Sequence, residues 1–448
     1  MKKIVVFGLA RSGIAVINFL SKLDYEIQIC DDQQESIDKI LNLPNIIKCY
    51  DVSNIRWGGV ESLILSPGVP LHFPEPHGIV KLANKNQIRI ISDIEYFCQI
   101  FSKQNYIGIT GTNGKSTSTT LISQIFQNSS KKFDFGGNIG RSIFNMAILP
   151  ENSHYILELS SYQLDLIYQA HLKIAILLNV TPDHLIRHGN FKNYVIAKKR
   201  IFQNQGEGDF SVIGVDSKQT AAIYQELKDD RSFKANLIPF SIKNILTNGF
   251  AIKNHIIYEN GQKIANLQGK ILIKGDHNLE NILASFVTCY LSKIDINIIL
   301  NSIAKFTGLK HRMQFVKRIG NVSFINDSKA TSLESTIMAI KNFDNIHLIL
   351  GGEVKNDDFN LLKKYEKNIC KCYLVGSSTD ELHDILSDKI ICKKNYNLES
   401  AINESYQEAK EFTIESNVLL SPAATSFDQW QDFEERGQFF IDCVTRLI

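Results

Sequence analysis

The sequence predicts an α/β fold in three domains, and three observations lead to this prediction. Short apolar runs rich in β-branched residues alternate with helix-compatible segments along the chain, which is typical of parallel sheets with crossover helices. Glycines and polar residues follow many of these runs, at the sheet edge where ligands usually bind. The length of 448 residues corresponds to about three domains of ordinary size.

The composition indicates a soluble globular protein and is compatible with small anionic ligands. Hydrophobic residues make up 44%, charged residues 21%, and the net charge is only +2. The lysines are scattered, so the sequence does not predict a nucleic-acid track or a membrane surface. No segment reaches the roughly 18 consecutive apolar residues that a membrane span needs. The eight cysteines lack zinc-site spacing and are expected to be reduced thiols, so we expect a cytoplasmic protein.

The first expected domain covers residues 1–93 and begins with the stretch MKKIVVFGLARSG. Two lysines before an apolar run superficially resemble a secretion signal. Arg11 stops the run after Ala10, too early for the apolar core of a signal, so we interpret the run as the first strand of the fold.

The motif GLARSG then places Gly8 and Gly13 around a strand-to-helix turn that could take a diphosphate. Asp31 and Asp32 follow the next strand, about 20 residues on, as ribose-binding acids do. The glycine spacing is not that of the dinucleotide fingerprint, so NAD binding has weak support. A turn without any ligand is an equal alternative.

The second expected domain, residues 94–307, contains the stretch YIGITGTNGKST. Gly111 and Gly114 let the backbone turn tightly and direct N–H groups at phosphate oxygens. Lys115 would place a cation on the phosphates, and Ser116 or Thr117 would offer a hydroxyl to Mg²⁺. The spacing departs from the usual phosphate-loop pattern, but strand, glycines, lysine and hydroxyls occur together and predict a nucleotide site.

Side chains that could bind the Mg²⁺ ion of a nucleotide follow two later strands of this domain. Glu158 lies near the end of HYILELS, and Asp183 and His184 lie just past KIAILLNVT. In YVIAKKRIF, the basic run from Lys198 to Arg200 by itself indicates only a solvated helix face. Residues 208–274 look β-rich, with a hairpin turn at residues 260–261.

The third expected domain, residues 308–448, is a further α/β unit. Asp327, Lys329 and Thr331 follow one strand, Lys355 follows another, and Ser426 follows a third. Each could be a cap or a turn residue. Together they supply a carboxylate, two cations and hydroxyls at one sheet edge, enough to hold a small anionic molecule.

Eight motifs together resemble those of a known family. They are GTNGKST, ELSSYQLD, NVTPDHL, AKKRIF, GDHNLENILA, HRMQFV, NDSKATS and LLSPAATSFDQW. In this order they are typical of the Mur ligases of peptidoglycan synthesis, and the resemblance spans nearly the whole chain. The segments SDIEYF, GGEVKNDDF and SPAATSFDQWQDFEERGQFF are similar to the branch of the family that adds D-glutamate.

The resemblance implies an architecture and a reaction. The first domain would be a Rossmann-like UDP-binding domain, the central one a P-loop ATPase with a small β-rich portion, and the last a Rossmann-like domain that binds the amino acid and closes on ATP. The expected substrates are UDP-N-acetylmuramoyl-L-alanine, D-glutamate and ATP, and the expected reaction is amide formation through an acyl phosphate. The expected cofactors are two Mg²⁺ ions and a CO₂-derived carbamate on Lys198, in a monomeric chain.

The resemblance also implies roles for individual residues. Catalysis is expected from Lys115, Glu158, His184 and Lys198, and Mg²⁺ binding from Ser116, Glu158, His184 and Lys198. The nucleotide is expected to meet Gly111, Thr112, Asn113, Gly114, Lys115, Ser116, Thr117, Asn278, Asn281, Arg312, Asp327 and Lys329. The other substrates are expected to meet Ala10, Arg11, Ser12, Asp31, Asp32, Ser66, Gly68, Asn138, Ser160, Gln163, Thr331, Lys355, Ser426 and Phe433.

Some residues depart from the family pattern. Ala10 stands where a third glycine is common, Glu353 and Val354 replace an Asp-Gly pair, and Thr425 and Trp430 differ from the usual residues near the amino-acid site. Three alternatives remain: a sister ligase or a folylpolyglutamate-type ligase, a non-catalytic nucleotide sensor, and an NAD-dependent oxidoreductase. The last leaves GTNGKST unexplained, and the folylpolyglutamate type lacks a first domain like residues 1–93.

Overall fold

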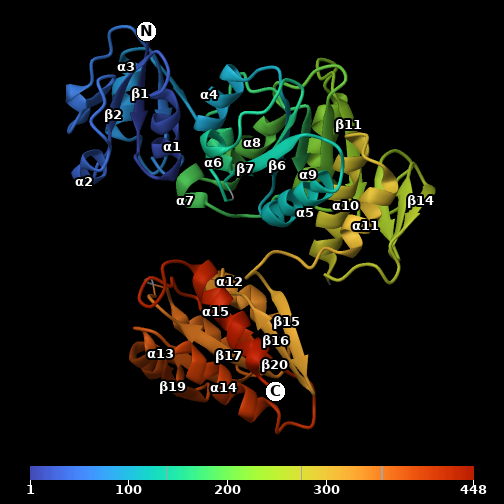
Figure 1. Cartoon of the computed structure of the whole chain (residues 1–448). Coiled ribbons are helices and arrows are strands. Elements are labelled where there is room, and N and C mark those ends of the chain that lie inside the picture. Colours follow the sequence, from blue (N-terminus) through green and yellow to red (C-terminus); the bar gives the residue numbers. More distant parts are fainter. Residues whose placement is uncertain (139, 274, 355–356) are drawn as a thin grey trace. The chain divides into compact units, whose positions relative to one another are not determined.

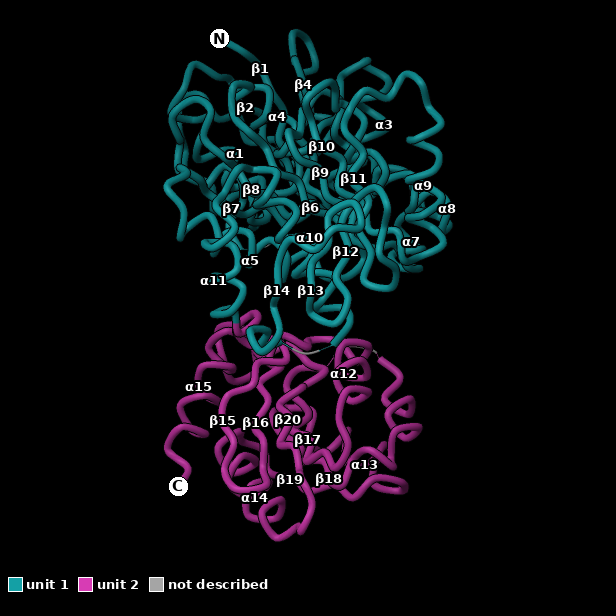
Figure 2. The backbone as a smooth tube through the Cα atoms, turned by 90° about the vertical axis from the view of Figure 1, so that its right-hand side faces the viewer, with its two compact units in different colours: residues 1–306 teal, residues 307–448 magenta. Residues whose placement is uncertain are grey.

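The computed structural model describes residues 1–138, 140–273, 275–354 and 357–448, and these residues form three sheets (Figure 1). The chain divides into two compact units, residues 1–306 and 307–448 (Figure 2). The first unit contains two of the sheets and the second unit contains the third. The predicted three-part α/β fold is therefore confirmed.

The first sheet is entirely parallel, with the order β3-β2-β1-β4-β5. Its strands are β1 (Lys2–Phe7), β2 (Tyr25–Cys30), β3 (Ile46–Lys48), β4 (Val60–Leu65) and β5 (Arg89–Ile91). The accompanying helices are α1 (Arg11–Leu20), α2 (Gln34–Asp38), α3 (Gly78–Lys85) and α4 (Asp93–Ile100). The signal-like N-terminal run is the first strand, β1, as predicted, and the structure places it at the centre of this sheet.

The second sheet has nine strands in the order β14-β13-β12-β11-β10-β9-β6-β8-β7. They are β6 (Asn105–Thr110), β7 (Phe133–Gly137), β8 (His154–Glu158), β9 (Ile174–Leu177), β10 (Phe210–Gly214), β11 (Asn236–Ser241), β12 (Phe250–Lys253), β13 (Ile256–Glu259) and β14 (Gln262–Asn266). Its helices are α5 (Lys115–Gln127), α6 (Ser161–Leu164), α7 (Leu185–His188), α8 (Phe191–Lys199), α9 (Lys218–Asp229), α10 (Asp276–Leu291) and α11 (Ile296–Ala304).

The β-rich portion continues this sheet. β12 pairs parallel with β11, and β13 and β14 extend the sheet as antiparallel strands. The predicted hairpin turn lies between β13 and β14, where Asn260 has φ 50° and Gly261 has φ 82°. Positive φ at both positions is the signature of the type I′ turn, so the sequence signal is confirmed.

The third sheet has the order β15-β16-β20-β17-β18-β19. Its strands are β15 (Gln314–Ile319), β16 (Val322–Asn326), β17 (Ile346–Gly351), β18 (Ile369–Val375), β19 (Cys392–Tyr396) and β20 (Ser416–Leu420), with helices α12 (Leu333–Ile340), α13 (Thr379–Leu386), α14 (Leu398–Ala409) and α15 (Phe433–Arg446). All pairs are parallel except β15 with β16. The C-terminal ends of β16, β20 and β17 therefore meet at one edge.

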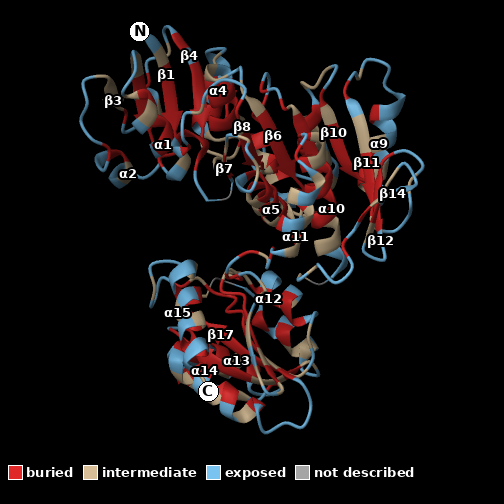
Figure 3. Cartoon of the chain, turned by 45° about the vertical axis from the view of Figure 1, so that its right-hand side comes forward, coloured by how far each residue is buried: buried red, intermediate tan, exposed pale blue. Residues whose placement is uncertain are grey.

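Buried residues concentrate in the central strands and on the helix faces that cover them (Figure 3). In the first unit, α4 connects the two sheets through a buried carboxylate. Glu95 is fully buried, and its oxygens accept hydrogen bonds from the backbone N–H groups of Tyr168, Gln169 and Ala170 at 2.9–3.2 Å. Bonding to several N–H groups compensates for removing the charge from water.

Among the helices in the described ranges, none is long and apolar enough to cross a membrane.

Candidate active site

The phosphate loop, residues 110–115, connects the end of β6 to the start of α5. Gly114 has φ +83°, and a Cβ there would lie 2.0 Å from Asn281 Oδ1 and 3.1 Å from Leu178 Cδ1. A side chain is therefore excluded at this position both by backbone strain and by crowding. The unusual glycine spacing nevertheless gives a tight turn at the N-terminus of a 13-residue helix, which suits an anion.

Lys115 folds over this loop. Its Nζ donates hydrogen bonds to the carbonyl oxygens of Gly111 and Thr112, both at 2.9 Å. The loop is also held from the segment after β9: the N–H of Asn113 donates to Asn179 Oδ1 at 2.9 Å, and Asn179 Nδ2 donates to Glu280 Oε2 at 2.9 Å. Burial raises the pKa of Glu280 to about 7. Asn179 and Glu280 lie within the motifs NVTPDHL and GDHNLENILA, but neither was given a role from the sequence, because the hydrogen bond between them joins residues 101 positions apart.

Two of the residues expected to bind the nucleotide base lie on α10. Asn281 is buried and its Oδ1 accepts a hydrogen bond from Ser118 Oγ of α5 at 3.3 Å. It therefore lies against the phosphate loop. Asn278 is one turn earlier on the same helix and half-buried. Their predicted contact with adenine stays a prediction.

Glu158 ends β8 and is 2% exposed. Its Oε1 accepts a hydrogen bond from Asn138 Nδ2 at 2.7 Å, whereas its Oε2 is buried without a hydrogen-bond partner among the described residues. A buried carboxylate oxygen with no protein donor costs free energy and fits a cation. The described residues contain no cluster of three or more His, Cys, Asp or Glu side chains suited to a metal. Mg²⁺ requires few protein ligands because waters and phosphates complete its coordination.

Lys198 is where the interpretation from residue type alone is wrong. It lies on α8 and is 1% exposed, rather than on a solvated face. Its Nζ donates to the carbonyl oxygen of Gly111 at 2.7 Å and lies 4.8 Å from the ring of Tyr194. Burial, and next the charge of Lys115, hold the pKa of Lys198 well below its usual value. Lys199 fits the solvated interpretation, since it forms an ion pair with Glu226.

His184 stands half-exposed at the start of α7, in a left-handed conformation with φ 52°. Its Nε2 is 3.3 Å from Asp183 Oδ2. The structure adds a residue that the sequence analysis missed: His188 is buried, with Nε2 2.9 Å from Ser161 Oγ and Nδ1 3.5 Å from Asp165 Oδ2. These contacts attach α7 to α6. Burial, followed by the charge of Arg187, lowers the pKa of His188 to about 4.

Ser160 and Gln163 form a capping box on α6, in which Ser160 Oγ accepts from the Gln163 N–H and Gln163 Oε1 accepts from the Ser160 N–H. Their side chains therefore have a local structural role. Contact with a substrate stays a prediction for both.

The first-sheet residues of the expected UDP site converge at the ends of β1 and β4. Gly8 has φ +90°, and its carbonyl accepts from Ser66 Oγ at 2.7 Å; Ser12 Oγ lies 3.4 Å from the same hydroxyl. Asp31 Oδ2 accepts from the N–H of Leu9, so this carboxylate fixes the turn. These contacts form a turn between β1 and β4, where the strand order of the parallel sheet reverses. Ligands commonly bind at such a point.

The remaining members of this set lie at its rim. Asp32 is exposed, and its carboxylate is 3.2 Å from His77 Nε2. Ala10 and Gly68 are exposed, and the Arg11 guanidinium donates to the carbonyl oxygen of Asn138 at 3.3 Å. Arg11 thus connects the first-sheet site to the residues around Glu158.

In the second unit, Asp327 directly follows β16 and is 5% exposed. It accepts from Ser421 Oγ at 2.9 Å and from the Met313 N–H at 3.1 Å, and burial raises its pKa to about 6.

The other predicted residues of the second unit lie in different surroundings. Lys329 Nζ lies 5.7 Å from the ring of Phe433. Thr331 is half-buried, Ser426 is buried and Arg312 is exposed, while Lys355 lies outside the described residues.

Arg436 on α15 is a further residue that the sequence analysis missed. It is 3% exposed, and its guanidinium donates to Ser328 Oγ at 3.0 Å and to the carbonyl oxygens of Ser328, Ala424 and Thr425 at 2.8–3.3 Å. This residue holds together the loops that follow β16 and β20. Its segment, FEERGQFF, entered the sequence analysis only as part of the family resemblance, and Arg436 was given no role there.

Two family models match the first unit. The Mur ligase MurD-like N-terminal domain matches residues 2–92, and the Mur ligase middle domain matches residues 109–289. Together they cover more than half of the chain. The chain belongs to the Mur ligase family.

Curated relatives match this Mur ligase over its full length. The UDP-N-acetylmuramoylalanine–D-glutamate ligase of Rickettsia prowazekii is 39% identical, covering 99% of this chain and 98% of the relative. The ligase of the same name from Thermoanaerobacter is 36% identical, covering 100% of this chain and 98% of the relative.

Solved structures show the same fold at lower identity. The UDP-N-acetylmuramate-alanine ligase of Thermotoga maritima has a TM-score of 0.58 and 16% identity, covering 99% of both chains. The MurF ligase of Thermotoga maritima, solved with ADP, has a TM-score of 0.54 and 17% identity, covering 99% of this Mur ligase and 95% of that chain. The three-sheet architecture is thus that of Mur ligases.

Proposed function

We propose that this Mur ligase joins D-glutamate to UDP-N-acetylmuramoyl-L-alanine in peptidoglycan synthesis, with cleavage of ATP to ADP and phosphate. One observation carries the choice of substrate. Relatives that match the chain end to end at 34–39% identity bear the name of the D-glutamate-adding ligase. The phosphate loop and the buried carboxylate beside it supply the matching chemistry.

The reaction requires activation because a carboxylate is a poor electrophile. Transfer of the γ-phosphoryl group of ATP to the substrate carboxylate gives an acyl phosphate and ADP. The amine of D-glutamate then attacks the acyl carbon, a proton leaves the nitrogen, and the C–O bond to phosphate breaks to leave the amide. The first step demands mainly alignment and charge neutralisation from the protein.

The residues of the first unit fit this demand. The N–H groups of the phosphate loop and the Lys115 ammonium would hold the phosphates of ATP, and Glu158, Ser116 and His184 would hold Mg²⁺. When bound, the metal neutralises phosphate charge. Arg11 and Asn138 would place the substrate carboxylate near that centre, since they connect the first-sheet site to Glu158.

A carbamate on Lys198 completes the proposed site. Reaction with CO₂ requires the neutral amine, and forms an N–C bond with release of one proton. Burial of Lys198 favours that neutral form. A carbamate carries a negative charge and two oxygens, so it would act as a further metal ligand beside Gly111.

The roles of the remaining predicted residues are part of the same proposal. We assign residues 1–93 to the UDP substrate, 94–307 to ATP and 308–448 to D-glutamate and closure, and we propose a monomer. In the last domain, Asp327, Lys329 and Arg312 would meet the nucleotide, while Thr331, Ser426 and Phe433 would meet D-glutamate.

The deciding experiment measures phosphate release with Mg-ATP, UDP-N-acetylmuramoyl-L-alanine and one amine at a time: D-glutamate, L-glutamate, L-alanine, L-lysine or diaminopimelate. We expect release only with D-glutamate, together with the matching amide by mass spectrometry. Release with another amine would assign the chain to a sister ligase. ATP binding without amine-dependent release would favour a nucleotide sensor instead.

A further inference from the structure

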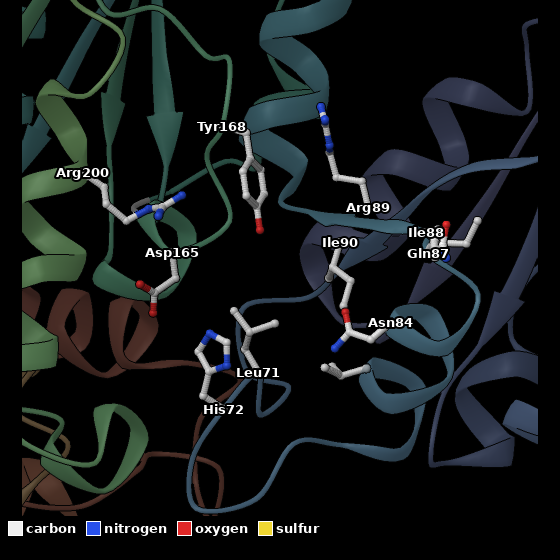
Figure 4. A pocket seen from close by; sticks show the side chains of 11 residues that line it. Leu71, His72, Asn84, Gln87, Ile88, Arg89, Ile90, Asp165, Tyr168 and Arg200 are labelled. Carbon is white, nitrogen blue, oxygen red and sulfur yellow. The ribbon is translucent and has the colours of Figure 1, made fainter.

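A cavity of about 440 Å³ lies in the first unit, outside the residues assigned above. One wall comes from the first sheet, through α3, β5 and the loop after β4, and the other from the segment after α6 and from Arg200 (Figure 4). The volume falls within the range of small-molecule sites. None of its lining residues has a role in the proposed reaction.

The cavity contains a stacked cationic group. The guanidinium carbon of Arg89 lies 5.8 Å from the ring centroid of Tyr168, and that of Arg200 lies 5.4 Å from the same centroid. Figure 4 shows Tyr168 between the two arginines. Stacking on a ring fixes a guanidinium in place while leaving its N–H groups able to bind an anion.

The two arginines differ in what else they contact. Arg200 donates to the carbonyl oxygens of Leu164 and Ile167, so it also has a structural role. The Arg89 side chain is exposed; it contacts the Tyr168 ring and forms no hydrogen bond or ion pair within the described part of the chain. Its N–H groups are therefore available to a ligand.

Other polar groups of the cavity are similarly uncommitted. The side chains of His72, Asn84 and Gln87 are exposed, Tyr168 is 41% exposed, and none of these side-chain polar groups forms a hydrogen bond with another residue of described position. The floor is apolar, with Leu71, Val80 and Ile90 at 6%, 1% and 6% exposure. An apolar floor with a few polar groups around it is the usual composition of a ligand site.

The net charge of the residues that line the cavity favours an anionic ligand. Two arginines oppose a single carboxylate, Asp165. We propose that this cavity is a second ligand site, which binds a small organic anion through Arg89 and accommodates the apolar body of that anion on Leu71, Val80 and Ile90. The anionic group is a carboxylate or a phosphate. The ligand would contact both the first sheet and the segment after α6.

Benzoate, phenyl phosphate and the neutral isostere benzamide are suitable probes, tested by titration calorimetry on the full chain. We expect benzoate or phenyl phosphate to bind at least about tenfold more tightly than benzamide, because a charge-assisted hydrogen bond contributes about that factor. The tighter of the two anions identifies the preferred group. This comparison uses the unaltered chain and requires no variant. Equal binding of benzamide overturns the proposal.

Variants locate the binding. Arg89→Gln and Tyr168→Leu should each weaken anion binding about tenfold, and Arg231→Gln, a matched change at another exposed arginine of the first unit, should leave it unchanged. All three variants should keep D-glutamate-dependent phosphate release.

The proposed site is refuted if Arg89→Gln leaves anion binding unaffected, or if Arg231→Gln weakens it equally. Displacement of benzoate by UDP-N-acetylmuramoyl-L-alanine also refutes it, because the anion would then occupy the substrate site. The titration does not depend on ligase activity, so it can fail independently of the proposed function.

Discussion

At the scale of single residues, Lys198 shows how position changes chemistry. A lysine on a solvated helix is a cation. The Nζ of Lys198 instead lies 2.7 Å from a loop carbonyl oxygen, and burial disfavours its charged form.

We predict that Lys198→Ala reduces phosphate release at least a hundredfold, and that formate or acetate in solution restores part of the activity. Each small carboxylate would replace the missing carbamate. Lys199→Ala is the matched control and should remain active, and full activity of untreated Lys198→Ala would contradict the carbamate.

His347 on β17 is expected to make the stability of the second unit depend on pH. It is 1% exposed, its Nδ1 lies 3.0 Å from Tyr373 Oη, and burial lowers its pKa to about 4. In the unfolded chain His347 binds a proton near pH 6.5, whereas in the folded chain it does so only near pH 4. The free energy of unfolding therefore falls as the pH decreases between these values.

We predict a loss of up to ~3 kcal/mol from His347 across that range, measured as faster hydrogen exchange in β17 at pH 5 than at pH 7 after correction for the intrinsic rate. His347→Gln should weaken this dependence. If the variant and the unaltered chain show the same pH dependence, His347 is not its source.

The phosphate loop and Glu158 were predictable because their signals are local: a glycine pattern and a strand end occupy a few adjacent residues. Lys198 was not predictable from residue type, because its burial depends on a loop 87 residues earlier in the chain. Arg436 was missed for a similar reason, since its partner Ser328 is 108 residues away. Only the resemblance to a family pointed to Lys198.

At the scale of elements, the turn between β6 and α5 depends on a missing side chain. We predict that Gly114→Ala weakens ATP binding at least tenfold, because φ +83° and a Cβ 2.0 Å from Asn281 Oδ1 would force the loop away from the helix. Nucleotide titration calorimetry measures the change. Gly269→Ala is a matched control, since Gly269 also has a positive φ of 70° but nothing within 4 Å of the added atom. Comparable ATP affinity in both variants would contradict the crowding argument.

Most elements were foreseeable from alternating apolar runs, and so was the hairpin around Asn260. Periodicity did not reveal that β12 to β14 join the same sheet as the phosphate-loop strand. Strand pairing depends on which edge is available in the folded chain, and a short sequence pattern contains no information about the edge of a distant sheet.

At the scale of the whole molecule, the second unit has its own hydrophobic cores. Both clusters of the third sheet draw on residues after 312 alone, including Leu348, Leu374 and Phe440. We predict that residues 307–448 fold when expressed separately. Their circular dichroism spectrum should be that of a protein with both helices and strands, and their unfolding in urea should be cooperative. The fragment should release no phosphate from ATP, because the phosphate loop is in the other unit. A spectrum of an unfolded chain would show that the second unit needs the first.

The buried carboxylate of α4 has a consequence for how the chain is made. Glu95 leaves the ribosome 73 residues ahead of the first backbone N–H that binds it. At translation rates of 5–20 residues per second, this delay lasts roughly 4 to 15 seconds. During that interval the nascent first sheet can form its strands, but the helix that leads out of it has to keep its charge in water. Docking of this helix therefore waits for residues 168–170, and a nascent-chain chaperone would have this interval in which to bind it.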